Sequence, residues 1–151
     1  MKLISFVFSF KNEENNLEEL IKRVDTSVKK LKNYNYELIF VNDDSDDNSA
    51  KILENLQKTF PITLINMSRT FGVGPCVLAG FNHVKGDCVV YMDSDLQDPP
   101  ELLDKLINKY ENGADVVHTV RTERLGETKF KLLLTKIAYK GINLLSDINR
   151  P

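Results

Sequence analysis

Short apolar runs alternate with helical repeats along most of this chain, and this alternation limits the possible folds more than any other feature of the sequence. Several of the runs are apolar almost throughout, which is typical of strands covered on both faces. Strict alternation of strands and helices predicts a mainly parallel sheet with right-handed crossovers. Five runs rich in Val, Ile and Phe are predicted strands: Leu3–Ser9, Glu37–Asn42, Ile62–Met67, Asp87–Met92 and Asp115–Val120.

Apolar residues recur at three- and four-residue steps between these runs, as they do in helices that bury one face. The longest stripe extends from Leu17 to Leu31, and shorter ones include Leu53, Leu78 and Leu106. The pair Pro99–Pro100 indicates where the fourth helix begins, because the first turn of a helix does not need the N–H that proline lacks. With 151 residues the chain fits one ordinary domain, which we expect to span residues 1–151.

The composition excludes several classes of protein. Apolar residues make up 42% of the chain and charged residues 28%, which excludes disordered, collagenous and fibrous proteins. A net charge of −2 provides no basic field that could attract nucleic acid, so we expect no nucleic-acid partner. Cys76 and Cys88 lie in apolar runs without the spacing of metal ligands, which fits a reducing compartment.

The sequence contains no pattern that predicts a membrane span or a secretion signal. No apolar stretch approaches the ~18 residues needed to cross a bilayer. The run Leu3–Phe10 is followed by no small-residue cleavage site, and Lys11, Glu13 and Glu14 come directly after it. We therefore predict that the chain itself is cytoplasmic.

Polar residues collect where four of the predicted strands end. Because the carboxyl ends of parallel strands meet at one edge of a sheet, where ligands bind in such folds, we expect these residues to form one rim. That rim is predicted to carry acids, amides and an arginine. Its segments are Ser9–Glu13, Asn42–Asp47, Ser68–Gly72 and Asp93–Asp98.

The segment Asp93-Ser94-Asp95 is the sharpest chemical signal in the chain. The two-residue period of a strand places both carboxylates on one side and Ser94 on the other. Two carboxylates so close repel each other unless a cation lies beside them, and Mg²⁺ or Mn²⁺ binds one or two carboxylates plus substrate phosphates. The pair therefore predicts a metal–diphosphate site, against the plainer interpretation of an acidic turn that caps the helix at Pro99.

Two acidic segments also admit other interpretations. Asp93 would be the nucleophile of a site resembling the dehalogenase-type phosphotransferases, but there the motif follows the first strand, whereas here it follows the fourth. The segment Asp43–Asp47 has the acid spacing of a calcium loop, but Asn48 stands where that loop needs Gly. The residues alone leave open whether this segment is a solvated loop that caps the next helix, or whether Asp43 accepts an N–H of a nucleobase.

Basic residues add two candidates. Arg69 is placed to clamp a diphosphate, because guanidinium binds phosphate through two hydrogen bonds, and a solvated surface arginine is equally compatible with the sequence. Between residues 127 and 145, Lys129, Lys136 and Lys140 lie at one edge of an apolar face. Such a helix usually packs on a core, and the competing hypothesis is contact with an anionic membrane surface.

Together these motifs resemble the family 2 glycosyltransferases with a GT-A fold, and within them the polyprenyl-phosphate sugar transferases, the dolichol-phosphate mannose synthase and undecaprenyl-phosphate glucosyltransferase group. The family's Val-Pro-Val-Tyr-Asn-Glu-Glu is echoed over residues 8–14, its Asp-Asp-Gly-Ser-x-Asp over 42–47, and its Ser-Arg-Asn-Phe-Gly-Lys over 68–73. The string from 92 to 101 matches almost in full, and residues 120–124 follow the next segment. The resemblance implies a Rossmann-like α/β fold, a mainly parallel sheet flanked by helices.

The resemblance also implies an activity, which is inverting transfer of a sugar from a UDP- or GDP-sugar to a polyprenyl phosphate in cell-envelope glycan or glycolipid synthesis. It implies that Mg²⁺ or Mn²⁺ is held by Asp95 and Asp93. The alternatives are a non-catalytic nucleotide-sugar-binding fragment that needs a partner chain, and a transferase with a saccharide acceptor. The nucleotide-sugar contacts implied by position are Ser9, Lys11, Glu13, Val41, Asp43, Arg69, Asp93, Ser94, Gln97 and Arg121.

The chain departs from the family pattern at several of these positions. Ser9 stands for Pro, Lys11 for Tyr, Asp44 for Gly and Val73 for Lys. Family members continue beyond Pro151 into the acceptor side, which carries the candidate catalytic Asp, so no catalytic residue is assigned. We therefore expect the N-terminal, donor-binding part of a GT-A domain, at the inner face of the membrane, that self-associates through the surface the missing C-terminal part would cover.

Overall fold

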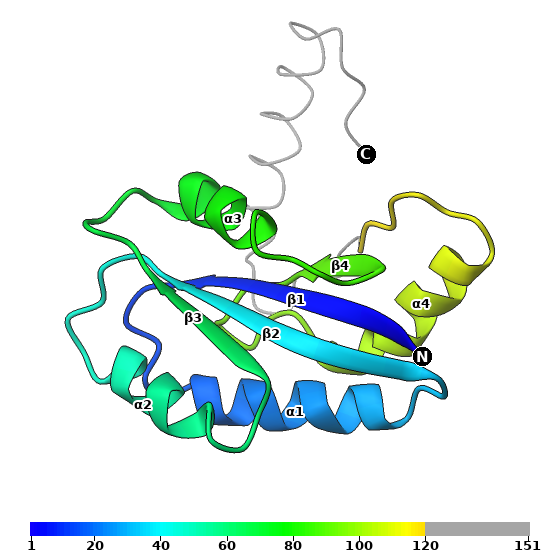
Figure 1. Ribbon diagram of the computed structural model, residues 1–151, viewed down its shortest axis with the longest axis horizontal. Helices are drawn as coiled ribbons and strands as arrows, with labels where there is room; N and C mark the ends of the chain where they lie inside the picture. The colour runs from blue at the N-terminus through cyan, green and yellow to red at the C-terminus, as the bar shows by residue number, and fades with distance from the viewer. Residues whose placement is uncertain (120–151) are drawn as a thin grey trace, which may run out of the picture. The chain divides into compact units, whose positions relative to one another are not determined.

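A four-stranded parallel sheet with helices on both faces makes up the part of the chain that the structure describes (Figure 1). The computed structural model describes residues 1–119. Its contacts divide the chain into two compact units, residues 1–115 and 116–151, and the fold described below is that of the first unit. The predicted helix between 127 and 145 and the candidate Arg121 lie outside the described residues, and the expectation of one domain over residues 1–151 stays a prediction.

The first strand of the chain lies inside the sheet, and later strands are added on both sides of it. Its spatial order is β3-β2-β1-β4, and every neighbouring pair is parallel. The chain therefore moves outward from β1 to β3 and then crosses back to place β4 on the other side of β1. In open α/β sheets, the crevice at such a switch point is where ligands bind. The strands are β1 (Lys2–Phe10), β2 (Tyr34–Asn42), β3 (Ile62–Asn66) and β4 (Cys88–Tyr91).

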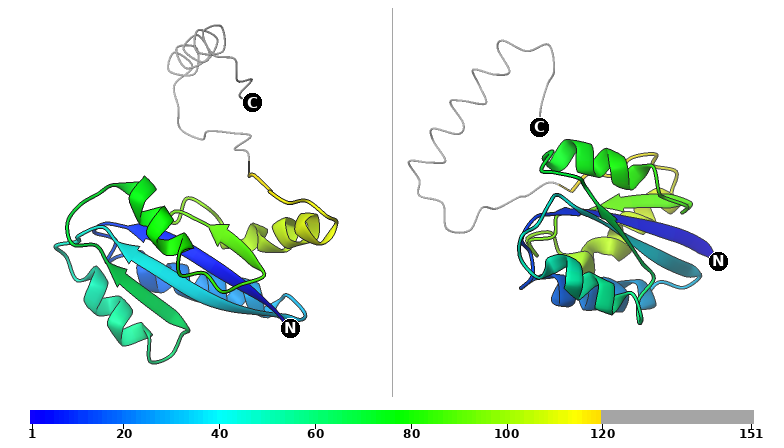
Figure 2. Two further views of the ribbon diagram at one scale, coloured as in Figure 1. Left: turned by 45° about the horizontal axis from the view of Figure 1, so that its top comes forward. Right: turned by 60° about the vertical axis from the view of Figure 1, so that its left-hand side comes forward.

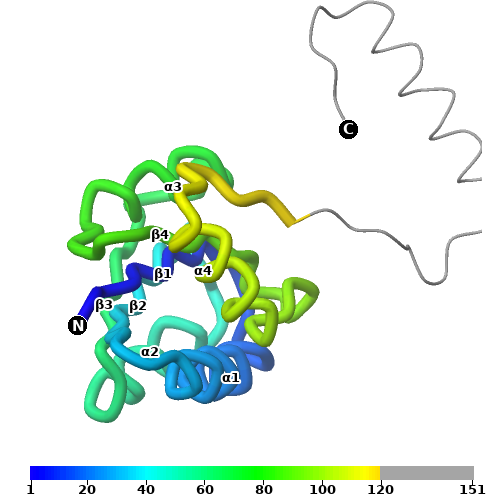
Figure 3. Tube along the Cα trace, turned by 90° about the vertical axis from the view of Figure 1, so that its right-hand side faces the viewer, coloured from blue at the N-terminus to red at the C-terminus, as the bar shows by residue number. Residues whose placement is uncertain are grey.

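Helices cover the two faces of this sheet unequally. The end-on view shows α1 and α2 below the sheet and α3 above it (Figure 3), and the views in Figure 2 agree. A short 3₁₀ helix, η1, leads directly into α4, with Pro100 in its first position as the proline pair predicts. The helices are α1 (Leu17–Lys29), α2 (Ser49–Leu56), α3 (Val73–Phe81), η1 (Pro100–Leu102) and α4 (Leu103–Glu111).

Two separate hydrophobic cores follow from the alternation of side chains along the strands. The even-numbered residues of β1 and β2, with Phe6, Phe8 and Phe40 among them, pack against α1, α2 and α4 in what we call the main core. Their rings stack, with the centroids of Phe8 and Phe40 4.6 Å apart. The odd-numbered residues of these strands face α3 in a smaller cluster, the α3 core, which comprises Val7, Ile39, Val41 and Cys76.

The strand predicted over Asp115–Val120 is not confirmed. Residues 115–119 have no regular structure, and Val116 is 70% exposed. A strand exists only with a hydrogen-bonded neighbour, and among the described residues β4 pairs with β1 alone. The apolar pattern of this segment therefore indicates only a propensity to form a strand, and the described part of the chain contains no strand with which it pairs. Within residues 1–119, no helix is long and apolar enough to cross a bilayer.

Candidate functional site

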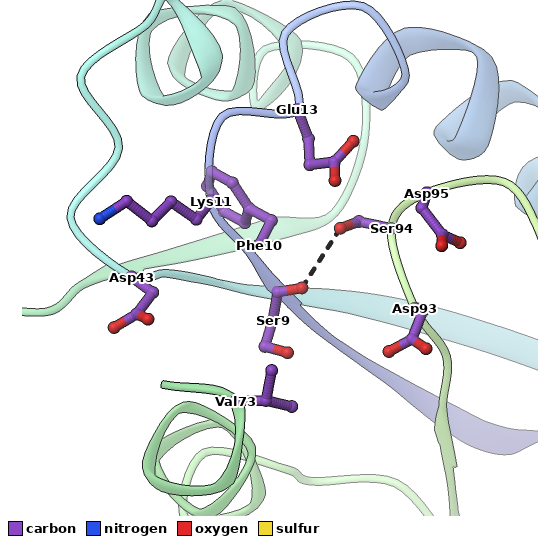
Figure 4. Close-up of a pocket in the computed structure, with 9 residues that line it drawn as sticks. All are labelled: Ser9, Phe10, Lys11, Glu13, Asp43, Val73, Asp93, Ser94 and Asp95. Atoms are coloured by element: carbon purple, nitrogen blue, oxygen red, sulfur yellow. Dashed lines mark hydrogen bonds between the residues drawn. The ribbon is translucent and has the colours of Figure 1, made fainter. Parts of the chain in front are cut away.

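An open cleft of about 290 Å³ lies at the switch point of the sheet, where β1 and β4 end beside the start of α3 (Figure 4). Figure 4 shows Asp93 and Asp95 on one side of it and Asp43 with Lys11 on the other, with Ser9 between. The fold thus brings together seven of the predicted site residues at one cleft. The residues lining it are Ser9, Phe10, Lys11, Glu13, Asp43, Val73, Asp93, Ser94 and Asp95.

The acidic turn that follows β4 keeps the alternation of a strand after the strand itself has ended at Tyr91. Asp93 and Asp95 are exposed, whereas Ser94 between them is 4% exposed. The hydroxyl of Ser94 donates to the backbone carbonyl of Ser9 at 3.2 Å and so ties the turn to the end of β1. Both carboxylates therefore lie on the solvent side of the turn, as the two-residue period predicts.

Local hydrogen bonds and one strained residue hold this turn in shape. The hydroxyl of Tyr91 donates to Asp93 Oδ1 at 2.8 Å, and the backbone N–H of Gln97 donates to Asp95 Oδ1 at 3.0 Å. Leu96 has a φ of 63°, in the left-handed region that a residue with a Cβ rarely adopts. Its side chain packs against the main core, which holds the backbone in that conformation.

The two carboxylates fit a divalent cation. A carboxylate offers about four acceptor positions, so the bonds from Tyr91 and Gln97 leave Asp93 and Asp95 with the capacity to ligate a metal. Within residues 1–119, no three His, Cys, Asp or Glu side chains gather in a way that could hold an ion on their own. Asp93 and Asp95 could therefore hold a divalent cation only together with further ligands, such as water and substrate phosphates.

The loops that follow β1 and β2 are joined by backbone-to-side-chain hydrogen bonds. Asn12 N–H donates to Ser45 Oγ at 3.0 Å, and Glu13 N–H donates to Ser49 Oγ at 2.9 Å. Asn12, with a φ of 58°, returns a bond by accepting the N–H of Asp46 on Oδ1. These bonds fix the position of Glu13 at the cleft.

Asp47 braces the same two loops. Its carboxylate accepts the backbone N–H groups of Glu14 and Ser49, at 3.1 and 2.9 Å. Burial alone would raise the pKa of Asp47, but the hydrogen bonds from Ser49 and Glu14 outweigh burial and hold that pKa below its usual range. Asp47 thus satisfies the first N–H of α2, whereas Asn48 at the N-cap position makes no side-chain capping bond, and the contact of Asp43 with a nucleobase stays a prediction. Asp44 adopts a φ of 61°, consistent with an Asp standing where the family pattern has Gly.

Asp43 is the most constrained acid of the cleft. It is 7% exposed, and its two carboxylate oxygens accept the backbone N–H groups of Phe71 and Gly72 at 2.7 and 2.9 Å. Burial acts to raise the pKa of Asp43, yet these two N–H donors, with smaller contributions from Cys76 and Lys11, hold the pKa below its usual range. Asp43 is therefore an ionised, buried carboxylate that reaches from the end of β2 to the loop before α3.

The loop before α3 has two more fixed contacts. Lys11 Nζ donates to Thr70 Oγ1 at 2.6 Å, which links the first and third loops of the rim. The guanidinium carbon of Arg69 lies 4.5 Å from the centre of the Phe71 ring, a cation–π contact. Arg69 is exposed and does not line the cleft itself.

The structure does not bring every predicted contact residue to the cleft. Val41 is fully buried in the α3 core, and Gln97 is exposed just beyond the acidic turn. Phe10 and Val73 do line the cleft, although they were not among the predicted contacts. Phe10 lies next to the predicted site residues Ser9 and Lys11, and Val73 is the last residue of the motif at 68–73. Their places in these motifs could therefore have identified both as residues of the cleft. The assignment of each residue to base, ribose, diphosphate or metal stays a prediction.

Comparison with known proteins identifies the sequence family of this chain. The family model described as Glycosyl transferase family 2 matches residues 5–150. An uncharacterized glycosyltransferase of Synechocystis is 39% identical over 149 residues, which are 98% of this chain and 46% of that protein. The dolichol-phosphate mannosyltransferase of Pyrococcus furiosus is 34% identical over 148 residues, which are 98% of this chain and 41% of that protein. The chain thus spans less than half the length of these relatives.

The fold has solved counterparts. A crystal structure of S. aureus TarS, residues 1–349, superposes with a TM-score of 0.56 at 21% identity, covering 82% of this chain and 40% of that one. At this identity the likeness supports the fold alone. The parallel sheet with flanking helices is therefore the GT-A type of α/β fold that the motifs predict, represented here by part of such a domain.

Proposed function

We propose that this chain, which belongs to glycosyl transferase family 2, binds a nucleoside-diphosphate sugar in the cleft between β1 and β4. The observation that carries the proposal is the placement of two exposed carboxylates, Asp93 and Asp95, at the switch point of a parallel sheet. A nucleoside diphosphate is an anion and would not approach these acids alone. The proposed ligand is therefore the diphosphate together with a divalent cation.

Asp95 and Asp93 would hold that cation, Mg²⁺ or Mn²⁺, on the solvent side of the acidic turn. When bound, such an ion supplies positive charge that stabilises the departing diphosphate. The bond from Ser94 to the carbonyl of Ser9 fixes the distance between the acids and the end of β1. Ser9, Glu13 and Lys11 then line the part of the cleft where we place the nucleoside.

The proposed reaction is transfer of the sugar to a polyprenyl phosphate with inversion at the anomeric carbon. A phosphate oxygen of the acceptor attacks that carbon, a new C–O bond forms, and the bond to the nucleoside diphosphate breaks from the opposite side. The acceptor is already anionic, so the step requires little help from a general base. The name of the Pyrococcus relative, a dolichol-phosphate mannosyltransferase, supports this acceptor class.

A lipid-linked acceptor would place the reaction at the inner face of the membrane. The predicted basic amphipathic helix between 127 and 145 lies outside the described residues, so its role stays a prediction. Co-sedimentation of the chain with anionic vesicles at low salt tests it, since a surface-bound basic helix is released as salt rises. A chain that stays in the supernatant at every salt concentration would exclude this membrane contact.

The donor site is tested directly by calorimetric titration of the chain with UDP and with GDP, each with and without Mn²⁺. We expect metal-dependent binding of one nucleotide, and Asp95→Asn should weaken it at least tenfold by removing a charged metal ligand. The matched control is Asp46→Asn, which removes an exposed acid that does not line the cleft. If a folded chain binds neither nucleotide with Mn²⁺, the proposed function is wrong.

A further inference from the structure

We propose that Tyr91 is a positioning residue of the cation site, whose hydroxyl group orients the carboxylate of Asp93 toward the metal ion. The inference rests on the proposed function, because it takes Asp93 as a ligand of the divalent cation that accompanies the diphosphate. Tyr91 is the last residue of β4 and does not belong to the motifs that predict the site. The hydrogen bonds of its hydroxyl group, and the strand that holds it, carry the inference.

Tyr91 belongs to the sheet, whereas Asp93 belongs to the turn that follows it. The backbone of Tyr91 pairs with Val7 in the parallel ladder between β4 and β1. Asp93 lies beyond the end of the strand and is exposed. The two-residue period of a strand places the side chains at 91 and 93 on the same side of the chain. The hydroxyl of Tyr91 donates to Asp93 Oδ1 at 2.8 Å, so a residue of the sheet holds a carboxylate of the turn.

The hydroxyl of Tyr91 also contacts Ser9, near the end of β1. The two oxygens are 3.5 Å apart, which makes this the weaker of the two contacts. A phenol has one proton and an ionised carboxylate can only accept, so Tyr91 donates to Asp93 and Ser9 donates to Tyr91. The resulting chain of hydrogen bonds joins β1 to the acidic turn. Ser9 stands where the family pattern has Pro, so that pattern does not supply the first hydroxyl of this chain.

The two acids of the turn are therefore held in different ways. Asp95 accepts the backbone N–H of Gln97, two residues further along the same turn, at 3.0 Å. That bond moves with the turn, whereas the bond from Tyr91 ties Asp93 to the sheet. Ser94 already holds the backbone of the turn against β1, and Tyr91 adds the direction of one carboxylate.

An oriented carboxylate should bind a cation more tightly, because less side-chain freedom is lost on binding. The bond from Tyr91 occupies one of about four acceptor positions on Asp93, so positions for the ion remain. The same bond draws negative charge away from Oδ1, which acts in the opposite direction. Loss of a group that hydrogen-bonds a metal ligand commonly lowers metal affinity by about 10- to 100-fold, so orientation should outweigh the charge effect. Since Asp93 is exposed, we expect the lower end of that range.

The test uses Tyr91→Phe, which keeps the ring and removes the hydroxyl. The quantity measured is the Mn²⁺ concentration that gives half-maximal binding of UDP or GDP, whichever the wild-type chain binds. We expect Tyr91→Phe to raise this concentration about tenfold. The matched control is Tyr36→Phe, because the hydroxyl of Tyr36 donates to Asp25 Oδ1 at 2.7 Å and neither residue lines the cleft. The control should leave the concentration unchanged. An unchanged or lower Mn²⁺ requirement in Tyr91→Phe would overturn the inference.

Carbon-13 signals of the aspartate carboxyl groups give a second readout, which needs neither metal nor nucleotide. Tyr91→Phe should shift the carboxyl signal of Asp93, because that carboxylate loses a hydrogen bond, and should leave the signal of Asp95 in place. If Tyr91 only stabilised the turn as a whole, both signals would move together. An Asp93 signal that does not change, or equal changes at both acids, would refute the positioning role.

Paramagnetic broadening by Mn²⁺ separates failure of the inference from failure of the proposed function. With nucleotide present, Mn²⁺ should broaden the ring signals of Tyr91 more strongly than those of Tyr36, which lies six residues before the end of β2 at Asn42. If Tyr91 is broadened while Tyr91→Phe needs no more Mn²⁺ than the wild-type chain, the cation site stands and the inference is wrong. If a folded wild-type chain binds neither nucleotide with Mn²⁺, the proposed function is wrong, and the carboxyl signals still decide whether Tyr91 holds Asp93.

Discussion

The two faces of the sheet differ in the number and size of the apolar side chains that they bury. On the face that packs against α1, α2 and α4, Phe6, Phe8 and Phe40 are fully buried among leucines and isoleucines. On the opposite face, the α3 core has four buried residues, and the largest of them is Ile39. Exposed apolar side chains gather on this second side as well, since Leu78 and Phe81 of α3 are 65% and 42% exposed.

The difference shows that the face beside the cleft contributes less to the stability of the fold than the opposite face. The main core buries large apolar side chains, which is the dominant favourable contribution to folding. The α3 side is held by close backbone approach and by the polar bonds of Asp43, and it borders the cleft. The hydrogen bonds on the α3 side hold polar groups in fixed positions beside the cleft, but this side buries less apolar surface than the main core.

The sharpest way to test this contrast is to truncate two neighbouring residues of β2 that face opposite sides. Leu38 belongs to the main core and Ile39 to the α3 core, and both are fully buried. We expect Leu38→Ala to lower the free energy of unfolding by about 4 kcal/mol and Ile39→Ala by about 2 kcal/mol, because α3 can settle into the smaller space. Urea unfolding measures both, and equal losses would contradict the contrast.

The second prediction concerns the close approach of α3 to the sheet at Gly80. A Cβ on Gly80 would lie 2.5 Å from Val7 Cγ1 and 3.2 Å from Val41 Cγ2, so Gly80→Ala should cost about 1–3 kcal/mol of stability. Val7→Ala should relieve the clash, so that adding Gly80→Ala in that background costs much less. Additive losses in this double-mutant cycle, measured by urea unfolding, would mean that the helix does not rest on Val7.

A third prediction uses pH to separate the polar bracing of the α3 side from its apolar packing. The pKa of Asp43 is lower in the folded state than the unfolded value of about 3.9, so its contribution to stability is complete above that value and disappears as pH falls through the folded pKa. We expect Asp43→Asn to cost about 1–2 kcal/mol at pH 7, and this difference from wild type should shrink below pH 4. Unfolding curves from pH 7 to pH 2.5 test it, with Asp44→Asn as the control. A difference that is constant with pH would show that ionised Asp43 does not stabilise the fold.

The smallest effect is expected on the α1 side, where Arg23 forms a two-pronged ion pair with Glu101 at 2.8 and 2.7 Å. The hydrogen bond from Arg23 lowers the pKa of Glu101 to about 2, so the pair should be intact at pH 7 and weaken as pH falls from about 4.5 toward 2. Since the two side chains are 28% and 48% exposed, a double-mutant cycle with Arg23→Ala and Glu101→Gln should give less than about 1 kcal/mol. A larger coupling energy would mean that this surface ion pair contributes substantially to the free energy of unfolding.

Sequence periodicity predicts the architecture of residues 1–111 well, because each strand and helix there buries an apolar pattern that is local in the chain. The observed strand boundaries differ from the predicted ones where they depend on pairing with a strand that is distant in the sequence. β2 begins at Tyr34, three residues before the predicted start, because Tyr34, Asn35 and Tyr36 pair with the beginning of β1. Pairing also explains why residues 115–119 do not form the predicted strand, because the described part of the chain offers them no partner strand.

The cleft is predictable in outline and unpredictable in detail. The rule that polar residues gather at the carboxyl ends of parallel strands correctly brings Ser9, Asp43 and Asp93 to one cleft. It does not reveal that Asp43 is already bonded to Phe71 and Gly72, because that contact joins residues 28 and 29 positions apart and depends on the path of two loops. Hydrogen bonds between loops have no periodic signature in a sequence.

Leu96 has a consequence for anyone who wishes to redesign this cleft. A residue with a Cβ costs roughly 1–2 kcal/mol in the left-handed conformation it adopts, and Gly would remove that cost. Gly would also remove the side chain that anchors the acidic turn in the main core. A library that randomises this turn should therefore keep an apolar residue at position 96, because Gly variants selected for stability there would lose the contact that holds the acidic turn against the main core.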